Sequence, residues 1–187
     1  ENDFFIQFQV DTTPDLSPPQ IMYTSVEEGT FYAHGVNESS LTLYTNEPSS
    51  CKWDTADTSY EVMQNEMICS QSGYEPSSIY FGTFECATTL TGISDEEINY
   101  YYFRCQDQSE NANEESYKYS TKSSESTLSI TSFEPEGLQK NNTITLEVTT
   151  DGGAEDGKSI CKFSTETNTY TEMTEFLTTN NPKHEQE

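Results

Sequence analysis

Apolar and polar side chains alternate with a period of two in several short runs of this 187-residue chain. Such alternation places the apolar residues on one face of a β-strand and the polar residues on the other. In residues 100–105, for example, Tyr101, Phe103 and Cys105 are expected to share one face. The other runs with this pattern are Phe4–Val10, Leu41–Thr45, Ile79–Phe84, Tyr117–Tyr119 and Ile144–Val148.

Clusters of turn-forming residues separate these runs, as at Asn46–Ser50 and Asp107–Glu114. No stretch of the sequence carries a convincing apolar stripe with the 3.6-residue period of a helix. Many short strands joined by turns are typical of a β-sandwich. The pattern therefore predicts an all-β protein built from antiparallel β-sandwich modules.

One motif occurs twice in the sequence, at a constant offset of 110 residues. In each copy, a Cys-Lys-aromatic triplet is followed by a tyrosine and then by a methionine. The two copies consist of Cys51, Lys52, Trp53, Tyr60 and Met63, and of Cys161, Lys162, Phe163, Tyr170 and Met173. Five matches at one offset indicate an internal repeat.

The repeat defines the expected domain boundaries. Residues 1–12 are expected to form the last strand of a preceding module, and residues 13–19 a proline-containing linker. Residues 20–126 would form a complete module, and residues 127–187 the N-terminal part of a second, truncated one. Two alternatives are that the second module is a smaller domain in its own right, and that the first strand completes a sheet in a neighbouring molecule.

The repeat also predicts how the five cysteines pair. Cys69 and Cys86 have no counterparts in the second copy, so we expect them to pair with each other. Cys51 is then left with Cys105, at a separation typical of the core bridge of an immunoglobulin-like domain. Cys161 stays unpaired in this sequence, because the repeat would place its partner beyond residue 187.

Two short motifs resemble those of bacterial and archaeal immunoglobulin-like, or fibronectin III-like, tandem repeats in large cell-surface proteins. The first is the junction Phe8–Pro14 leading to Pro18–Ile21, and the second is the turn Arg104–Asn111. Glu110 departs from the family pattern, which usually has glycine there. The resemblance covers nearly the whole chain and implies a sandwich of about seven strands with a role in adhesion, display or spacing.

The resemblance also implies a calcium site, because related adhesins often hold Ca²⁺ between modules. The implied ligands are Asp11 at the junction and Asp107, Glu110, Asn111 and Asn113 in the turn. Carboxylate and amide oxygens suit Ca²⁺, which takes about 6–8 oxygen ligands. The alternative is a solvated acidic loop whose Asp and Asn side chains only cap turns.

The charge of the chain restricts its partners. Acidic residues number 33 against 8 basic ones, which gives a formal net charge of −25. Such a surface repels nucleic acid and anionic lipid, and the apolar runs are too short to span a bilayer. We therefore expect an extracellular surface protein that contacts neighbouring modules, other copies, or host and matrix proteins or glycans.

The sequence contains no recognisable set of catalytic residues, so we expect a structural or adhesive segment that acts as a stalk or spacer, and not an enzyme. One alternative is a carbohydrate-binding module that uses exposed Tyr or Trp. Another is a filament subunit assembled by strand addition. The strand would carry Phe4, Ile6, Phe8 and Val10.

Three further residues have predicted roles. Asn37 and Asn141 begin glycosylation sequons, Asn-Glu-Ser and Asn-Asn-Thr. Trp53 lies two residues after Cys51, so both side chains should face the same side of a strand. We expect Trp53 to pack in the core, with a sugar-stacking platform as the alternative.

Overall fold

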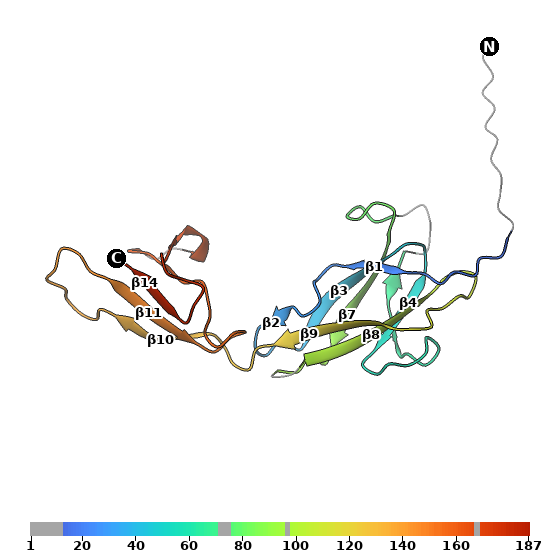
Figure 1. Cartoon of the computed structure of the whole chain (residues 1–187), viewed down its shortest axis with the longest axis horizontal. Coiled ribbons are helices and arrows are strands. Elements are labelled where there is room, and N and C mark those ends of the chain that lie inside the picture. The colour runs from blue at the N-terminus through green and yellow to red at the C-terminus, as the bar shows by residue number, and fades with distance from the viewer. Residues whose placement is uncertain (1–12, 71–75, 96–97, 167–168) are drawn as a thin grey trace, which may run out of the picture. The chain divides into compact units, whose positions relative to one another are not determined.

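The computed structural model describes residues 13–70, 76–95, 98–166 and 169–187 of the chain (Figure 1). These residues form fourteen β-strands and one short 3-10 helix, η1 (Tyr170–Glu172). Their strands pair into several sheets that are mainly antiparallel, so the prediction of an all-β fold is confirmed. Within the described ranges, no helix has the length and apolar character needed to cross a membrane.

Nine strands lie between residues 21 and 123 and form two sheets (Figure 1). The four-stranded sheet has the order β1 (Ile21–Thr24), β3 (Glu38–Thr45), β7 (Phe84–Thr91) and β6 (Ile68–Cys69). The five-stranded sheet has the order β2 (Phe31–Tyr32), β9 (Tyr117–Ser123), β8 (Ile98–Gln106), β4 (Ser50–Asp54) and β5 (Asn65–Glu66). β2 pairs with β9 in parallel, whereas β1 with β3, β4 with β8 and β6 with β7 are antiparallel.

Two compact units divide the chain. Of the described residues, the first unit comprises 13–25, 42–70, 76–88 and 101–118, and the second comprises 26–41, 89–95, 98–100, 119–166 and 169–187. The division passes through the long strands β3, β7 and β8. The boundary between the units therefore lies inside strands and does not coincide with the boundaries expected from the repeat. The domain boundaries expected from the repeat stay a prediction.

The alternation of β8 produces the core face that the sequence predicts. Tyr101, Phe103 and Cys105 are at most 1% exposed, whereas Tyr100 is 40% exposed. On β3, Leu41, Leu43 and Thr45 are likewise buried. Alternate side chains of a strand point to opposite faces, so these buried residues share the face of β8, or of β3, that packs in the core.

Trp53 connects the two sheets in the first unit. Its indole N–H donates to the Thr88 hydroxyl at 2.9 Å, from β4 to β7. Its ring also meets the ring of Tyr101 edge-on, with 5.6 Å between centroids. Trp53 is 4% exposed, so it packs between the sheets as predicted and its faces are closed to a sugar ring. The alternative of a sugar-stacking platform is therefore wrong for this residue.

The predicted strand at Ile79–Phe84 is only partly correct. β7 begins at Phe84, whereas Ile79 and Phe81 are 67% and 101% exposed in the preceding loop. The Ser77 amide donates to the Thr83 carbonyl and closes this loop, and the intervening residues therefore cannot join a ladder. Period-two spacing of apolar residues does not distinguish such a loop from a strand.

Five strands lie between residues 129 and 186. β10 (Ser129–Glu134), β11 (Leu146–Asp151) and β14 (Lys183–Gln186) form a three-stranded antiparallel sheet, and β12 (Lys162–Phe163) pairs with β13 (Thr174–Glu175). Their small core contains Thr150, Phe176 and His184, each less than 5% exposed. The ring of Phe176 meets that of Phe163 edge-on at 5.2 Å between centroids, which links the two-stranded sheet to this core.

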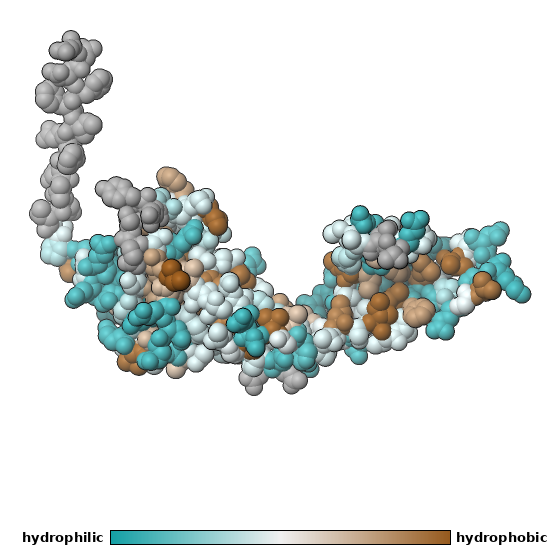
Figure 2. Space-filling model, turned by 180° about the vertical axis from the view of Figure 1, so that it is seen from behind, coloured by the Kyte–Doolittle hydropathy of each residue, from teal (hydrophilic) through white to brown (hydrophobic). Residues whose placement is uncertain are grey.

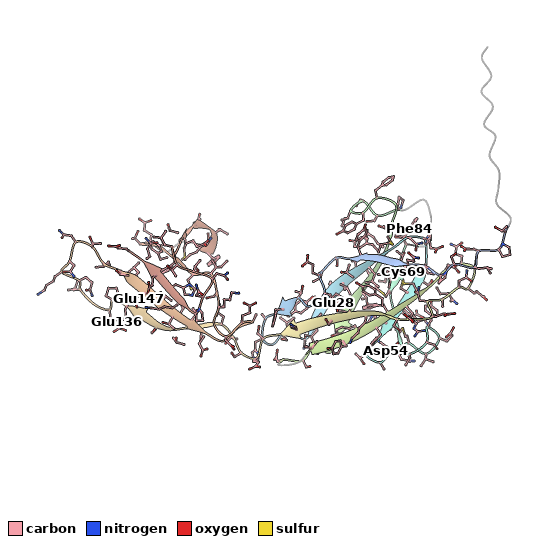
Figure 3. The ribbon with its side chains drawn as sticks, viewed as in Figure 1. Glu28, Asp54, Cys69, Phe84, Glu136 and Glu147 are labelled. Atoms are coloured by element: carbon pink, nitrogen blue, oxygen red, sulfur yellow. A yellow bond between two sulfur atoms is a disulfide. The ribbon has the colours of Figure 1, made fainter. Side chains whose placement is uncertain are left out.

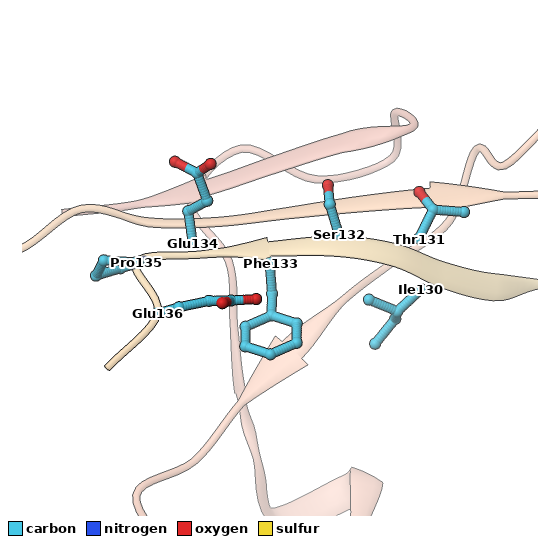
Figure 4. A pocket seen from close by; sticks show the side chains of 7 residues that line it. All are labelled: Ile130, Thr131, Ser132, Phe133, Glu134, Pro135 and Glu136. Carbon is cyan, nitrogen blue, oxygen red and sulfur yellow. The ribbon is translucent and has the colours of Figure 1, made fainter. Parts of the chain in front are cut away.

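β10 leaves apolar side chains in solvent. All six of its residues are exposed, with Ile130 at 63% and Phe133 at 58%. A register shift between Ile130 and Ser132 marks a β-bulge, which moves Ile130 and Phe133 to the same side of the strand (Figure 4). Apolar patches are also visible among polar side chains in Figure 2.

Candidate functional site

Two disulfide bonds fasten the larger sheets. Cys51 is bonded to Cys105 and Cys69 to Cys86, and these are the pairs that the repeat predicts. Cys51, Cys86 and Cys105 are at most 2% exposed. Cys69, which is labelled in Figure 3, lies on β6 and is bonded to Cys86 on the neighbouring strand β7.

Both bonds lie within a sheet and do not cross the sandwich. Cys51 on β4 is the direct cross-strand partner of Cys105 on β8, and Cys69 on β6 is that of Cys86 on β7. The Cys51–Cys105 bond therefore differs from the core bridge of immunoglobulin domains, which joins the two sheets, although its sequence separation is similar. Sequence separation could not reveal this, because it is similar whether the partner strand lies beside β4 or opposite it.

The two bonds nevertheless lie close together. The Sγ atoms of Cys51, Cys69 and Cys86 all lie within 4.8 Å of one another. The sheets therefore meet at the disulfides, and the cysteines form a compact sulfur cluster in the core.

The turn after β8 is organised by Asp107. Its carboxylate accepts the backbone N–H groups of Ser109 and Asn111, each at 2.8 Å, and the Asn111 side-chain amide at 2.7 Å. Glu110 has φ of 67°, the left-handed conformation that glycine adopts most easily. Glycine, which the repeats that the sequence resembles usually have at this position, would adopt the same conformation without strain.

Asn111 and Asn113 tie this turn to residues 13–19. The Asn111 amide donates to the Asp15 carbonyl at 3.0 Å, and the Asn113 amide donates to the Pro19 carbonyl. Asn113 also accepts the N–H of Cys105 at 2.8 Å. Both asparagines therefore serve as hydrogen-bonding braces, and their amide groups do not converge on one point.

Three carboxylates converge beside these braces. Oxygen atoms of Asp15, Glu47 and Asp107 lie within 4.8 Å of one another. Burial raises the pKa of Glu47, and the charges of Asp15 and Asp107 raise it further. A divalent cation would relieve this repulsion, and these three residues could supply carboxylate ligands to it.

The structure rearranges the calcium ligands implied by the resemblance. Asp107 belongs to the carboxylate cluster, but Glu110 is exposed and Asn111 and Asn113 brace the chain. Asp11 lies outside the described residues. Sequence reasoning missed Asp15 and Glu47, since they come from the linker and from the turn after β3 and share no motif.

The histidines make local hydrogen bonds. His34 Nδ1 lies 3.2 Å from Asp95 Oδ2, while the Ser123 hydroxyl donates to the other oxygen of Asp95. The serine is thus bonded to the carboxylate and not to the imidazole, unlike a nucleophile and its base. His184 is fully buried, and its ring nitrogens lie within 3.2 Å of the hydroxyl oxygens of Thr150, Ser159 and Thr179.

Exposed aromatic residues gather near the loop before β7. The ring of Tyr80 stacks on that of Tyr23 with 4.5 Å between centroids, and meets Tyr44 edge-on at 4.7 Å. Tyr23 is 47% exposed, and Phe81, which follows Tyr80 in the loop, is fully exposed. These rings form the aromatic surface best placed to contact an external partner in the first unit.

Several predicted residues stay apart from these clusters. The sequon residues Asn37 and Asn141 are exposed and lie outside the strands. Cys161 is a half-buried free thiol. The strand-addition residues Phe4, Ile6, Phe8 and Val10 lie outside the described residues.

Arg104 is the only arginine of the sequence and makes local contacts. Its guanidinium donates to the Ser116 hydroxyl, the Asn113 carbonyl and the Asp57 carboxylate. These hydrogen bonds, and the salt bridge between Arg104 and Asp57, connect β8 with the loop after β4.

Comparison with known proteins adds no family. The sequence matches no protein-family model and no curated protein. The functional argument therefore depends on the contacts of this chain.

Proposed function

We propose that the chain is an extracellular structural or adhesive segment, made of tandem immunoglobulin-like modules, that acts as a stalk or spacer in a large cell-surface protein. Its two disulfides are compatible with an oxidising, extracellular setting. The high negative charge supports a solvated surface that does not self-associate.

The strand order supports the immunoglobulin-like part of the proposal. In immunoglobulin domains, one sheet has the order A-B-E-D and the other contains C, F and G. Here β1, β3, β7 and β6 take the places of A, B, E and D, and β4, β8 and β9 those of C, F and G. Trp53 on β4 corresponds to the buried tryptophan of strand C, although the disulfides differ.

Matching β-bulges support the tandem repeat. In β1, a register shift falls between Ile21 and Tyr23, opposite Thr45 and Tyr44 of β3. In β10, a shift of the same kind falls between Ile130 and Ser132, opposite Thr150 and Thr149 of β11. A β-bulge is a specific feature of a fold, so its recurrence at the same step favours two copies of one module.

The observation that carries the spacer role is the Cys51–Cys105 bond between adjacent strands. A pulling force applied at the ends of residues 20–126 passes through this bond. The chain segment between these two cysteines therefore cannot be extended by the force. The cysteines are separated by 54 positions in the sequence, and the segment includes Cys69 and Cys86. Such a bond suits a spacer under tension, because only the strands outside the Cys51–Cys105 loop can then be pulled out of the module.

Single-molecule pulling of the whole chain tests this role. With the disulfides intact, unfolding of residues 20–126 should release at most about 180 Å of chain; after reduction it should release about 370 Å, at ~3.5 Å per residue. The oxidised module should also need a higher force than the reduced one. Unfolding of the oxidised module at the lowest measurable forces would contradict a role as a spacer under tension.

The exposed aromatic surface favours one second function, binding of a carbohydrate. Tyr23 and Tyr80 present a stacked pair to solvent, and aromatic faces bind sugar rings. A glycan array compares the two roles, with Tyr23→Ala as the matched variant. A specific signal that disappears in Tyr23→Ala would favour the binding module, and no signal would favour the spacer.

A further inference from the structure

The segment Asn65–Cys69 passes from one sheet of the first unit to the other. Its first strand, β5, pairs with β4 of the five-stranded sheet, and its second strand, β6, pairs with β7 of the four-stranded sheet. Between the two strands, the Met67 amide donates to the Cys51 carbonyl at 3.0 Å. This crossing brings the Cys69–Cys86 bond of one sheet next to Cys51 of the other.

Two disulfide bonds that belong to different sheets therefore meet in the sulfur cluster, in which the Sγ atoms of Cys51, Cys69 and Cys86 lie within 4.8 Å of one another. Ser49 lies against both bonds, since its hydroxyl oxygen is 3.8 Å from Cys51 Sγ and its carbonyl oxygen is 3.9 Å from Cys86 Sγ. A disulfide needs about 2.05 Å between its sulfurs. A change of cysteine rotamer moves a sulfur by about the remaining distance, so the sulfurs of Cys51 and Cys86 can meet by rotation of their own side chains.

Cys69 is the cysteine of the two disulfides that a molecule in solution can reach. Cys51, Cys86 and Cys105 are at most 2% exposed, whereas Cys69 is half-buried on β6, at the edge of the four-stranded sheet. Access to a sulfur atom helps to determine where a thiol attacks a disulfide. We therefore expect an external thiol to bond to Cys69 and to release Cys86 inside the cluster.

We propose that the sulfur cluster is a thiol–disulfide exchange site, in which a small thiol attacks Cys69 and the released Cys86 then displaces Cys105 from Cys51. The product contains a Cys51–Cys86 bond between β4 and β7. This bond joins the two sheets, whereas both original bonds lie within a sheet. The exchange goes beyond the spacer role and does not depend on it, because it follows from the positions of the sulfurs.

Each step replaces one S–S bond by another. The thiolate of the small thiol attacks Cys69 Sγ, the Cys69–Cys86 bond breaks, and Cys86 leaves as a thiolate with the electron pair. The Cys86 thiolate then attacks Cys51 Sγ. Cys105 leaves with the electron pair of the broken bond and takes up the proton that the small thiol lost. The number of disulfide bonds is unchanged, so the exchange requires the thiol and no oxidant.

The exchange would change how much of the chain a pulling force can extend. The Cys51–Cys105 loop spans 54 positions, whereas a Cys51–Cys86 loop spans 35 by the residue numbers. Unfolding of residues 20–126 would then release about 250 Å of chain in place of about 180 Å, at ~3.5 Å per residue. A thiol would thus lengthen the extended module without opening every disulfide.

The variant Cys69→Ser/Cys161→Ser tests the second step without added thiol, because Cys86 is then the thiol that remains beside the Cys51–Cys105 bond. The chain is incubated near pH 8.5, about the ordinary pKa of a cysteine thiol, and is then quenched with acid. Thiols are alkylated in denaturant and located by peptide mapping. We expect at least about a tenth of the chains to carry the Cys51–Cys86 bond and an alkylated Cys105, because a tenfold ratio is a small difference in free energy. Alkylation at Cys86 alone would overturn the proposal.

The variant Cys69→Ser/Cys86→Ser/Cys161→Ser is the matched control. It lacks a thiol to start the exchange, so it should keep the Cys51–Cys105 bond and incorporate no alkylating reagent. An alkylated Cys105 in this control would overturn the assignment of Cys86 as the attacking group.

Glutathione added to the Cys161→Ser chain tests both steps with the two native disulfides in place. After acid quenching, we expect a species with glutathione on Cys69, a Cys51–Cys86 bond and a free Cys105. In single-molecule pulling, the same treatment should add a population that releases about 250 Å. Glutathione on Cys69 with the Cys51–Cys105 bond intact, or no adduct at Cys69, would overturn the proposal. The unfolding force bears on the spacer role alone, so the two proposals can fail separately.

Discussion

The ammonium group of Lys162 lies over the ring of Tyr170, with Nζ 4.7 Å from the ring centroid. At this distance a cation–π contact contributes about 0.5–1 kcal/mol on an exposed surface. We expect Lys162→Met, which keeps the aliphatic stem and removes the charge, to lower the free energy of unfolding by about this amount. Urea denaturation measures the loss.

Lys140→Met is the control for this change, because Lys140 is an exposed lysine in the loop between β10 and β11. It should leave the free energy of unfolding unchanged within about 0.5 kcal/mol. An equal loss in both variants would show that net charge, and not the Tyr170 ring, determines the effect.

The two disulfides should contribute unequally to stability. Their sequence separations are 54 for Cys51–Cys105 and 17 for Cys69–Cys86. In the chain-entropy model, closing the longer loop stabilises by about 4 kcal/mol and closing the shorter by about 3 kcal/mol. Urea denaturation of the Cys51→Ala/Cys105→Ala and Cys69→Ala/Cys86→Ala variants should therefore show the larger loss in the first. The reverse order would indicate that native packing of the sulfur cluster outweighs loop entropy.

The left-handed conformation of Glu110 predicts a stabilising substitution. A residue with a Cβ atom costs about 1 kcal/mol or more at φ of 67°, whereas glycine does not. Glu110→Gly should therefore raise the melting temperature by a few degrees. The matched change Glu114→Gly, in the same loop without positive φ, should lower it or leave it unchanged. A lower melting temperature in Glu110→Gly would contradict the assigned backbone geometry.

The carboxylates of Asp15, Glu47 and Asp107 predict a response to calcium. Their oxygens lie within 4.8 Å of one another, and their mutual repulsion is relieved when a cation binds. We expect millimolar Ca²⁺ to raise the melting temperature of the wild-type chain, and a chelator to reverse the change. Asp15→Asn/Glu47→Gln should abolish the response, whereas Glu125→Gln, a change of an exposed acid elsewhere, should keep it. A response that persists in the double variant would place calcium elsewhere.

Strand periodicity predicted the fold class and the buried face of β8, because alternation of apolar and polar residues can be seen in the local sequence. Tertiary packing then buries the apolar face. Tyr101, Phe103 and Cys105 needed no other information. The disulfide pairs followed from comparing the two copies of the motif, which is also sequence information. Ile79 and Phe81 misled the prediction, because an alternation two residues long is equally compatible with a closed loop.

The candidate site was harder to predict, because its residues meet only through the fold. Asp107 belongs to a recognisable turn, but Asp15 approaches it from the linker and Glu47 from the turn after β3. Likewise, the neighbouring positions of β4 and β8 depend on the order of strands in the sheet. Neither strand order nor convergence of loops is encoded in local spacing.

His184 predicts how residues 127–187 respond to acid. Its side chain is fully buried and bonded to the hydroxyls of Thr150, Ser159 and Thr179, and burial lowers its pKa below the ordinary value of 6.5. The unfolded chain therefore binds a proton at a higher pH than the folded one does. The stability that depends on neutral His184 is complete above pH 6.5 and is lost as the pH falls from there toward the folded pKa.

We therefore expect the melting temperature of this part of the chain to fall between pH 7 and pH 5, and His184→Asn to weaken that dependence. His34→Asn is the matched control, since His34 is partly exposed beside Asp95, and the fall in melting temperature should persist in it. Nuclear magnetic resonance of the imidazole protons measures the cause directly. Titration of His184 at or above pH 6.5 in the folded chain would contradict the prediction, because the buried ring would then accept a proton as readily as the unfolded one.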